Sequence, residues 1–349
     1  MHVTVWGAGA WGVALAGDIV RTGHEVQVYS RRRASARLGP SFAALPATVA
    51  VTDDLPRAAA SSEMWLVVTP TPYLEDLALR LSPHVRPETV VLCSVKGLSA
   101  GSGERPTEVL GRLWAHASAA PLATLGGPTL AHEMGRDAPA SAVLAGSEPG
   151  LDPWRRALGG GSLRLEASDD VVGVELAGAL KNVVVIVSAC ARALYGENVA
   201  AALAHAGFDE MRRLARAAGA RDETILGIAG LGDLLLTHAA ADSRNRRCGE
   251  AIAAGRPLEA WLRAQESVVE GVGSAFGAHR LATRLGVSTP VFASALALVR
   301  GKPPRDTLAL LLRALGQGGG GPLERPRQPF AALLPSRPAA APSGPPPLA

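Results

Sequence analysis

The first half of the chain alternates short, continuously apolar runs with helical patterns. The runs that predict strands lie at 2–6, 25–30, 64–69, 89–95, 123–126 and 141–145. Between the first two, residues 11–22 show the apolar spacing of a helix. A strand that is apolar at successive positions is buried on both faces, as in a parallel sheet flanked by helices. We therefore expect an α/β fold in which a doubly wound Rossmann sheet, the dinucleotide-binding domain, occupies residues 1–167.

The second half of the chain has a different pattern. Ser168, Asp169 and Asp170 are candidate N-caps for a long apolar helical segment at 174–194. Further helical segments follow, and they are interrupted at Gly219, Gly230, Gly255, Gly286 and Pro290. We expect an all-helical substrate domain over residues 168–316. Residues 317–349 contain nine of the 26 prolines and a run of four glycines, which predicts a disordered Pro/Gly/Ala-rich tail.

Charge and hydropathy narrow the range of partners. The chain has 35 Lys and Arg against 31 Asp and Glu, a formal net charge of +4. These basic residues form no stripe interleaved with aromatics, so we expect no nucleic-acid partner. The longest apolar stretch, at 183–191, is about half of the roughly 20 residues that span a bilayer, which argues against membrane insertion.

The cysteines and the N-terminus indicate the compartment. Cys93, Cys190 and Cys248 are widely spaced and include no CxxC pair. This is typical of free thiols in a reducing compartment, and we expect neither a disulfide framework nor a metal site. The first strand begins at about Val3, which leaves no room for a secretory signal. The sequence therefore predicts a cytoplasmic protein.

A glycine-rich turn follows the first strand directly. Residues 7–12 read Gly-Ala-Gly-Ala-Trp-Gly, which is the pattern GxGxxG between a strand and a helix. Gly7 permits the tight turn, Gly9 lets the backbone approach a pyrophosphate, and Gly12 lets the helix pack closely on the sheet. The amides at the start of the helix, with the positive end of its dipole behind them, then face the phosphates. We expect a nicotinamide dinucleotide here.

The residues after the second strand bear on the choice of cofactor. An acid there would bind the ribose 2′-hydroxyl of NADH, whereas arginines accommodate the 2′-phosphate of NADPH. The chain has Arg31, Arg32 and Arg33 and no acid, which favours NADPH, with NADH still possible. The alternative is that these arginines are a solvated charge run.

Two charged residues interrupt apolar segments of the helical half. Lys181 lies in a helix that is otherwise apolar nearly all round, and a desolvated lysine has a pKa lowered toward the range useful for proton transfer. Alternatively, Lys181 reaches solvent from the helix edge or pairs with Glu175. Asp233 lies among glycines and leucines, and its alternative role is the N-cap of the helix that follows.

Polar residues also gather where phosphate could bind. Ser243, Arg244 and Asn245 follow soon after Asp233, and a guanidinium is a natural bidentate partner of phosphate. The alternative is that this cluster is the basic start of a helix. Lys96 and the segment 126–129 each come directly after a strand, at the sheet edge where doubly wound folds bind ligands.

Together and in this order, the motifs resemble the bacterial NAD(P)-dependent glycerol-3-phosphate dehydrogenases. The matching segments are GAGAWG at 7–12, KGL at 96–98, GPTLAHE at 127–133, VELAGALKNV at 174–183, GLGDLLLT at 230–237, SRNRRCG at 243–249 and VVEG at 268–271. The resemblance covers residues 1 to about 316. It implies a reversible reduction of dihydroxyacetone phosphate to sn-glycerol 3-phosphate for glycerophospholipid synthesis, without a metal, by a homodimer.

The resemblance also implies roles for single residues. Lys181 is the expected proton donor and acceptor at the substrate C2 oxygen, and Lys96 is shared between cofactor and substrate. The other expected substrate contacts are Gly127, Thr129, Asp233, Ser243, Arg244 and Asn245. The expected cofactor contacts are Gly7, Gly9, Ala10, Trp11, Gly12, Arg31, Arg32, Lys96, Ala131, Arg244, Val268 and Glu270.

The chain departs from the family pattern in several places. Ala10 replaces a common Ser or Thr, His132 stands where Lys is usual, and Ala206 stands where Arg is frequent. The segment 192–198 keeps its length but loses two glycines. Two alternatives therefore stay open: a related two-domain dehydrogenase of another small hydroxy acid, and a catalytically weakened NAD(P)-binding paralogue.

Overall fold

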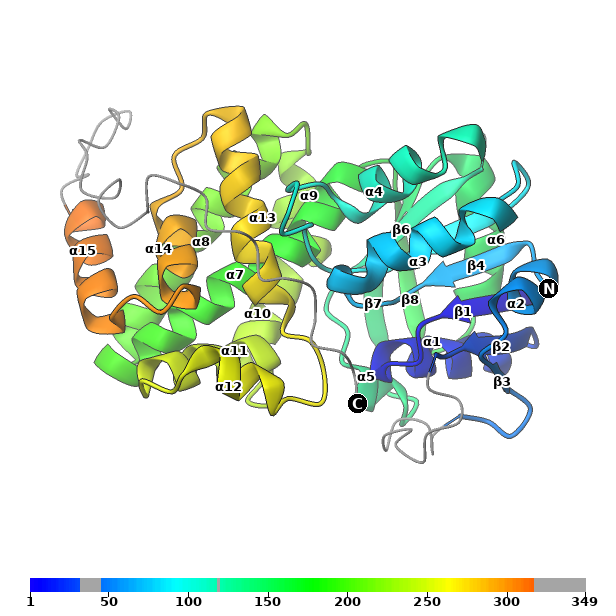
Figure 1. Cartoon of the computed structure of the whole chain (residues 1–349), viewed down its shortest axis with the longest axis horizontal. Helices are drawn as coiled ribbons and strands as arrows, with labels where there is room; N and C mark the ends of the chain where they lie inside the picture. The colour runs from blue at the N-terminus through cyan, green and yellow to red at the C-terminus, as the bar shows by residue number, and fades with distance from the viewer. Residues whose placement is uncertain (32–44, 118–119, 317–349) are drawn as a thin grey trace.

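The first half of the chain folds into one eight-stranded sheet (Figure 1). The structure is a computed structural model that describes residues 1–31, 45–117 and 120–316. The strands are β1 (His2–Trp6), β2 (Glu25–Tyr29), β3 (Ala50–Thr52), β4 (Met64–Val67), β5 (Val90–Cys93), β6 (Leu122–Gly126), β7 (Ala140–Gly146) and β8 (Leu163–Ser168). Their order is β3-β2-β1-β4-β5-β6-β7-β8, so the direction of winding reverses beside β1. That reversal is the switch point at which doubly wound sheets bind ligands.

Helices cover both faces of this sheet, as the unbroken apolar runs predict. They are α1 (Ala10–Arg21), α2 (Leu55–Ala60), α3 (Leu74–Leu81), α4 (Pro106–Leu113), α5 (Ala131–Met134) and α6 (Glu148–Leu158). Residues of α1 and α6 join one buried cluster and residues of α2, α3 and α4 join the other. The predicted α/β Rossmann class is therefore confirmed.

The sheet differs from the expectation in three respects. The sequence patterns indicate neither β3, which is three residues long, nor β8, whose Leu-Arg-Leu-Glu-Ala-Ser alternates apolar and polar side chains. Both are edge strands, so neither needs the continuous apolar run that marks a central strand. In addition, β7 runs antiparallel to β6, whereas the other neighbouring pairs are parallel.

The second half is helical and is built around one long helix. This is α7 (Val171–Tyr195), which begins at the predicted N-cap Asp170, whose carboxylate accepts the Gly173 amide at 2.8 Å. The other helices are α8 (Glu197–Ala217), α9 (Asp222–Leu226), α10 (Asp233–Ala239), α11 (Arg244–Ala253), α12 (Leu258–Arg263), α13 (Glu270–Leu285), α14 (Pro290–Val299) and α15 (Pro304–Gly316). A π-helical turn, η5 (Ile228–Gly232), leads into α10.

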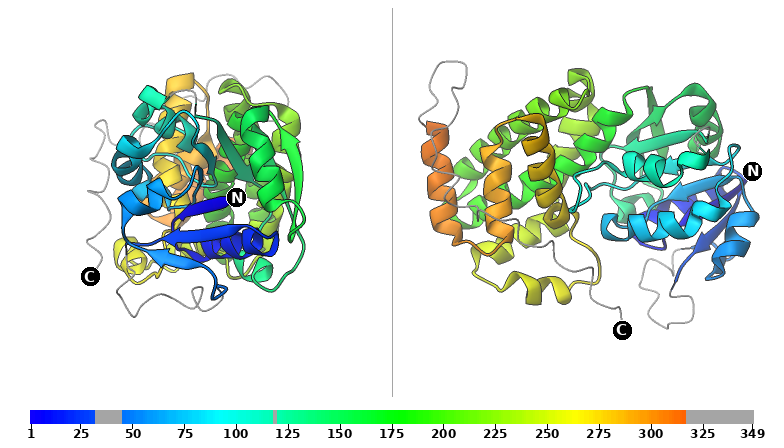
Figure 2. Two further views of the ribbon diagram at one scale, coloured as in Figure 1. Left: turned by 90° about the vertical axis from the view of Figure 1, so that its right-hand side faces the viewer. Right: turned by 45° about the horizontal axis from the view of Figure 1, so that its top comes forward.

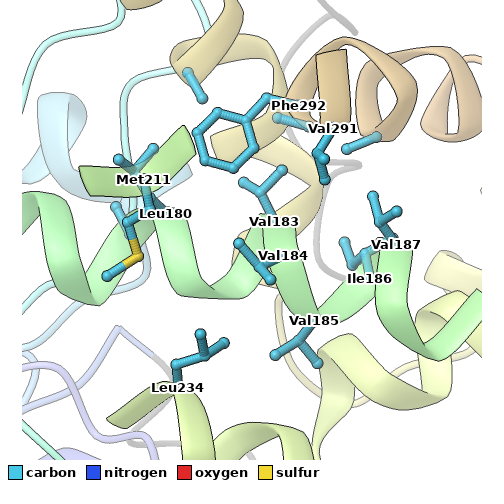
Figure 3. Close-up of a cluster of buried hydrophobic side chains, with 14 of the residues drawn as sticks. Leu180, Val183, Val184, Val185, Ile186, Val187, Met211, Leu234, Val291 and Phe292 are labelled. Atoms are coloured by element: carbon cyan, nitrogen blue, oxygen red, sulfur yellow. The ribbon is translucent and has the colours of Figure 1, made fainter. Parts of the chain in front are cut away.

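Helix α7 is the core of this half. Its side chains pack against those of α8, α10 and α14, as shown by Val183, Met211, Leu234 and Phe292 (Figure 3). By length and composition α7 could cross a membrane, but 89% of its most apolar window is buried inside the protein. It therefore has the surroundings of a core helix.

The sheet half and the helical half lie side by side (Figure 2). A buried carboxylate joins them: Glu175 of α7 accepts from Arg105 Nη1 at 2.7 Å and from the Thr107 amide at 2.8 Å, at the start of α4. Strands give way to helices between Ser168 and Val171, next to the predicted domain boundary, which stays a prediction. The predicted tail lies outside the described residues.

Candidate active site

The glycine turn has the geometry that a dinucleotide requires. Gly7 has a φ of +133°, and a Cβ at Gly12 would lie 2.2 Å from the Gly7 carbonyl oxygen, so neither position accepts a side chain without strain. A Cβ at Gly9 would meet nothing within 4 Å. Gly9 is also the N-cap of α1, and no side chain caps the helix there. The first amides of α1, beginning at Ala10, thus remain available to a pyrophosphate.

Trp11 connects this turn to the neighbouring strand ends. Its indole Nε1 donates to Ser94 Oγ at 2.9 Å, just after β5. Its ring centroid lies 5.8 Å from the Nζ of Lys96. The cofactor turn and the predicted substrate lysine are therefore adjacent.

Lys96 is held by the ends of two strands. Its Nζ donates to the Gly127 carbonyl oxygen at 2.9 Å and lies 3.4 Å from Thr129 Oγ1, in the loop after β6. The same Nζ lies 3.2 Å from Asp233 Oδ2, although the two residues are 137 positions apart. Lys96 thus connects the sheet half to the helical half.

Lys181 is 5% exposed, and its ammonium is satisfied inside the protein. Its Nζ forms an ion pair with Asp233 Oδ1 and donates to Thr237 Oγ1 at 2.7 Å. The alternative partner, Glu175, binds Arg105 instead. Burial lowers the pKa of Lys181 to about 8; Asp233 opposes this shift and Lys96 adds to it. A lysine with this pKa can exchange a proton near neutral pH.

Asp233 is the meeting point of the two lysines. Its carboxylate is 1% exposed and binds one ammonium group through each oxygen. It begins α10, but its side chain faces these two lysines, so the alternative role of a simple N-cap does not describe it. Two cations held on one anion leave a net positive charge where a phosphorylated ketone could bind.

In the segment 243–245, Ser243 and Asn245 hold the local structure, whereas Arg244 is exposed. Ser243 caps α11, accepting from the Arg246 amide at 3.4 Å, and the exposed Arg244 donates from Nη1 to the Val268 carbonyl oxygen at 3.0 Å. Asn245 is buried: its amide nitrogen donates to Asn182 Oδ1 at 2.8 Å, and its oxygen accepts the Gly271 amide at 3.0 Å. The groups that could contact an anion here are therefore the Arg244 guanidinium and the backbone amides that open α11 before Arg246.

In the described part of the chain, three more predicted cofactor residues lie near the ends of strands. Glu270 accepts the Thr71 amide at 3.1 Å, just beyond β4, and burial raises the pKa of its carboxyl. Ala131 opens the short helix α5 after the Gly127 loop. Arg31 is exposed and lies 3.7 Å from Asp76 Oδ2, with its guanidinium 5.2 Å from the centroid of the Tyr73 ring. Arg32 lies outside the described residues.

Comparison with known proteins agrees with this geometry. A family model described as the NAD-dependent glycerol-3-phosphate dehydrogenase N-terminus matches residues 2–151, and the model of the corresponding C-terminus matches residues 170–309. The chain belongs to the glycerol-3-phosphate dehydrogenase family.

Relatives named glycerol-3-phosphate dehydrogenase NAD(P)+ align over most of their length. One from Bradyrhizobium is 38% identical over 326 residues, which are 89% of this chain and 96% of the relative. One from Thioalkalivibrio sulfidiphilus is 37% identical over 307 residues, 83% and 90% of the two chains. The crystal structure of glycerol-3-phosphate dehydrogenase from Coxiella burnetii superposes with a TM-score of 0.81 at 28% identity, covering 89% of this chain and 98% of that one.

Within this glycerol-3-phosphate dehydrogenase fold, the departures from the family pattern do not remove the central ion pairs. His132 is exposed, 3.6 Å from Asp242 Oδ2, and Ala206 is partly buried against the helical core. The altered segment 192–198 joins α7 to α8. It places Arg192 beside His238, one residue beyond Thr237.

Sequence patterns did not indicate Thr237 or Asn182 as parts of the site. The lysines of the site did have a usable sign in the sequence, because this glycerol-3-phosphate dehydrogenase family member has only three lysines. The structure brings two of them together at Asp233. Arginine stays charged in proteins, whereas lysine can be deprotonated when it is buried. In a chain that uses arginine almost everywhere else, a lysine within an apolar helix is therefore a candidate for proton transfer.

Proposed function

We propose that the chain reduces dihydroxyacetone phosphate to sn-glycerol 3-phosphate with NAD(P)H, reversibly, and that the product feeds glycerophospholipid synthesis. The observation that carries this proposal is the convergence of Lys96 and Lys181 on Asp233, beside the glycine turn, with a Lys181 pKa lowered to about 8. Family membership supports the choice of substrate. The distances support the choice of residues.

The nicotinamide, when bound, supplies a hydride to the substrate C2. Lys181 donates its proton to the C2 oxygen as negative charge develops there, and it takes the proton back in the reverse direction. Asp233 and Thr237 hold the ammonium so that it faces the substrate. Because these groups are buried, water competes little for the proton.

The phosphate of the substrate binds at the start of α11. Arg244 supplies a charged, planar donor, and the first-turn amides and the helix dipole supply the rest. Lys96, Gly127 and Thr129 orient the substrate from the sheet half. Ser243 and Asn245 act by holding this helix start, since the Asn245 amide is already bound to Asn182 and Gly271.

The Gly7–Gly9–Gly12 turn would hold the pyrophosphate of the cofactor, and the neighbouring strand ends would hold the rest. We propose that NADPH is preferred and NADH accepted, because Arg31 and Arg32 follow β2 and could bind a 2′-phosphate. The sheet half carries the proposed cofactor contacts Ala10, Trp11, Lys96 and Ala131, and the starts of α11 and α13 carry Arg244, Val268 and Glu270. The reaction as proposed needs no metal.

The wider setting is also a proposal. We place the protein in the cytoplasm as a homodimer, with no nucleic-acid partner and no insertion into a membrane. The burial of α7 in the protein core favours this last point. We further propose that residues 1–167 form the cofactor domain, that 168–316 form the substrate domain, and that 317–349 are a separate tail.

The direct test is oxidation of NADPH and of NADH by purified protein in the presence of dihydroxyacetone phosphate, followed by the loss of absorbance of the reduced nicotinamide. We expect turnover with the phosphate ester and almost none with dihydroxyacetone, because Arg244 and α11 then have no anion to bind. Equal rates with both ketones would favour the related hydroxy-acid dehydrogenase. Tight NADPH binding with no turnover would favour the weakened paralogue.

A further inference from the structure

A second polar contact ties α10 to α7, beyond the lysine site. His238 follows Thr237 on α10, and its Nδ1 lies 3.1 Å from Ser188 Oγ while its Nε2 lies 2.7 Å from Arg192 Nη2. Ser188 and Arg192 are seven and eleven residues after Lys181, close to two and three turns of α7. The short helix α10 is therefore attached to one face of α7 at two levels.

The chemistry of the partners determines the proton on His238. A guanidinium has donors and no acceptor, so Arg192 must donate to an unprotonated Nε2. The proton of the neutral ring is then on Nδ1 and is donated to Ser188 Oγ, which in turn donates to the Val185 carbonyl oxygen at 3.2 Å. Only the neutral ring with this tautomer satisfies both contacts.

We propose that His238 is a positioning residue that holds α10, and with it Asp233 and Thr237, in register with Lys181. The inference rests on the proposed role of Lys181 in proton transfer. Helix α10 has only seven residues. Without the His238 contacts it is held by the packing of Leu234 (Figure 3), by the lysine site and by the bond from Arg246 Nη1 to the Ala239 carbonyl oxygen at its end. A displacement of about 1 Å at reacting groups is enough to lower turnover substantially.

The surroundings make this contact sensitive to pH. Burial and then Arg192 lower the pKa of His238, Glu197 of α8 raises it, and Arg246 of α11 lowers it further. As pH falls through this lowered pKa, Nε2 gains a proton and faces the guanidinium of Arg192, so the contact breaks. The positioning role is therefore present at neutral pH and lost in acid.

The test compares two variants of His238. In His238→Gln the side-chain oxygen can accept from Arg192 without titrating, whereas His238→Leu can accept nothing. We expect kcat at neutral pH to be near the parent value in His238→Gln and about tenfold lower in His238→Leu, with little change in KM. The ratio of kcat in His238→Gln to that in the parent should rise as the pH falls. Substrate phosphate titration cancels in this ratio.

His279 provides the matched control, since burial and then Arg300 and Arg280 also lower its pKa. The ratio for His279→Gln should stay flat with pH. A flat ratio for His238→Gln, or parent-like kcat in His238→Leu, would overturn the positioning role. If His238→Leu does not fold, the His238→Gln ratio still decides. Retained turnover in Lys181→Ala, measured alongside, would instead count against the proposed role of Lys181.

Discussion

The glycine turn at residues 7–12 and the lysine site around Asp233 serve one proposed reaction, but they are built in different ways. The turn is contiguous, and its function depends on the absence of side chains at Gly7, Gly9 and Gly12. The lysine site brings together residues 137 positions apart, and its function depends on charges being removed from water. The turn therefore depends on the conformation of the backbone, whereas the lysine site depends on how burial and neighbouring charges set the pKa of Lys181. They should therefore fail differently when they are changed.

The largest effect is expected at the lysine site. Lys181→Ala removes the proposed proton donor, and general acid catalysis is worth about a thousandfold in rate. We expect kcat to fall by about that factor while circular dichroism shows a folded chain, because Asp233 keeps Lys96 as a partner. The control is Lys302→Ala, which removes the third and exposed lysine. A parent-like rate in Lys181→Ala would remove this residue from the mechanism.

Substitutions in the glycine turn should instead lower the stability of the protein. In Gly12→Ala the new Cβ would lie 2.2 Å from the Gly7 carbonyl oxygen, and backbone cannot move aside cheaply. We expect the free energy of unfolding in urea to fall by about 3 kcal/mol, the upper end for overpacking.

Gly9→Ala is the matched variant within the same turn. Its Cβ would meet nothing within 4 Å, so stability should fall by less than about 1 kcal/mol, as for a weaker N-cap. The KM for NADPH should rise, because the methyl group occupies the space that the pyrophosphate needs. Equal losses of stability in the two variants would contradict the conclusion that Gly12 is needed for packing and Gly9 for cofactor binding.

The pKa of Lys181 can be measured directly, because the chain has only three lysines and their signals can be told apart. In protein labelled with ¹³C at lysine Cε, the signal lost in Lys181→Met should titrate with a pKa of about 8. Asp233 raises this pKa, so Asp233→Asn should lower it by about one unit or more. Reduction needs the protonated amine, so its rate falls as pH rises through the pKa. The rate of reduction by Asp233→Asn should therefore begin to fall at a lower pH than that of the parent. An unchanged titration would mean that Asp233 does not tune Lys181.

The same comparison explains what could be predicted from sequence. The Rossmann turn was predictable because strand, glycines and helix are adjacent in the chain. Lys181 and Asp233 each stood out as charges in apolar segments, but their pairing was not predictable, since it depends on how η5 directs α10 toward α7. The amide chain from Asn245 to Asn182 likewise needs three packed helices. Edge strand β8 was missed because its alternating pattern resembles exposed chain.

The smallest expected effect is on the choice between NADPH and NADH, at the arginines that follow β2. Arg31→Asp combined with Arg32→Ser removes the cations that could bind a 2′-phosphate and adds an acid that could bind a 2′-hydroxyl. A charge-assisted hydrogen bond is worth about 1.5–3 kcal/mol, and Arg31 is exposed and already near Asp76, so we expect the low end. The KM for NADPH should rise about tenfold more than that for NADH, because 1.4 kcal/mol is a factor of ten.

The control for this pair changes the net charge equally at a distance. Arg86→Asp with Arg305→Ser alters two exposed arginines outside the proposed site. If the control shifts both KM values as much as the test pair does, the effect is a long-range field and Arg31 and Arg32 are surface charge. If only the test pair discriminates between the two nicotinamides, the contact is local. Added salt should then narrow the difference between NADPH and NADH in the parent, because screening weakens an exposed ion pair with phosphate.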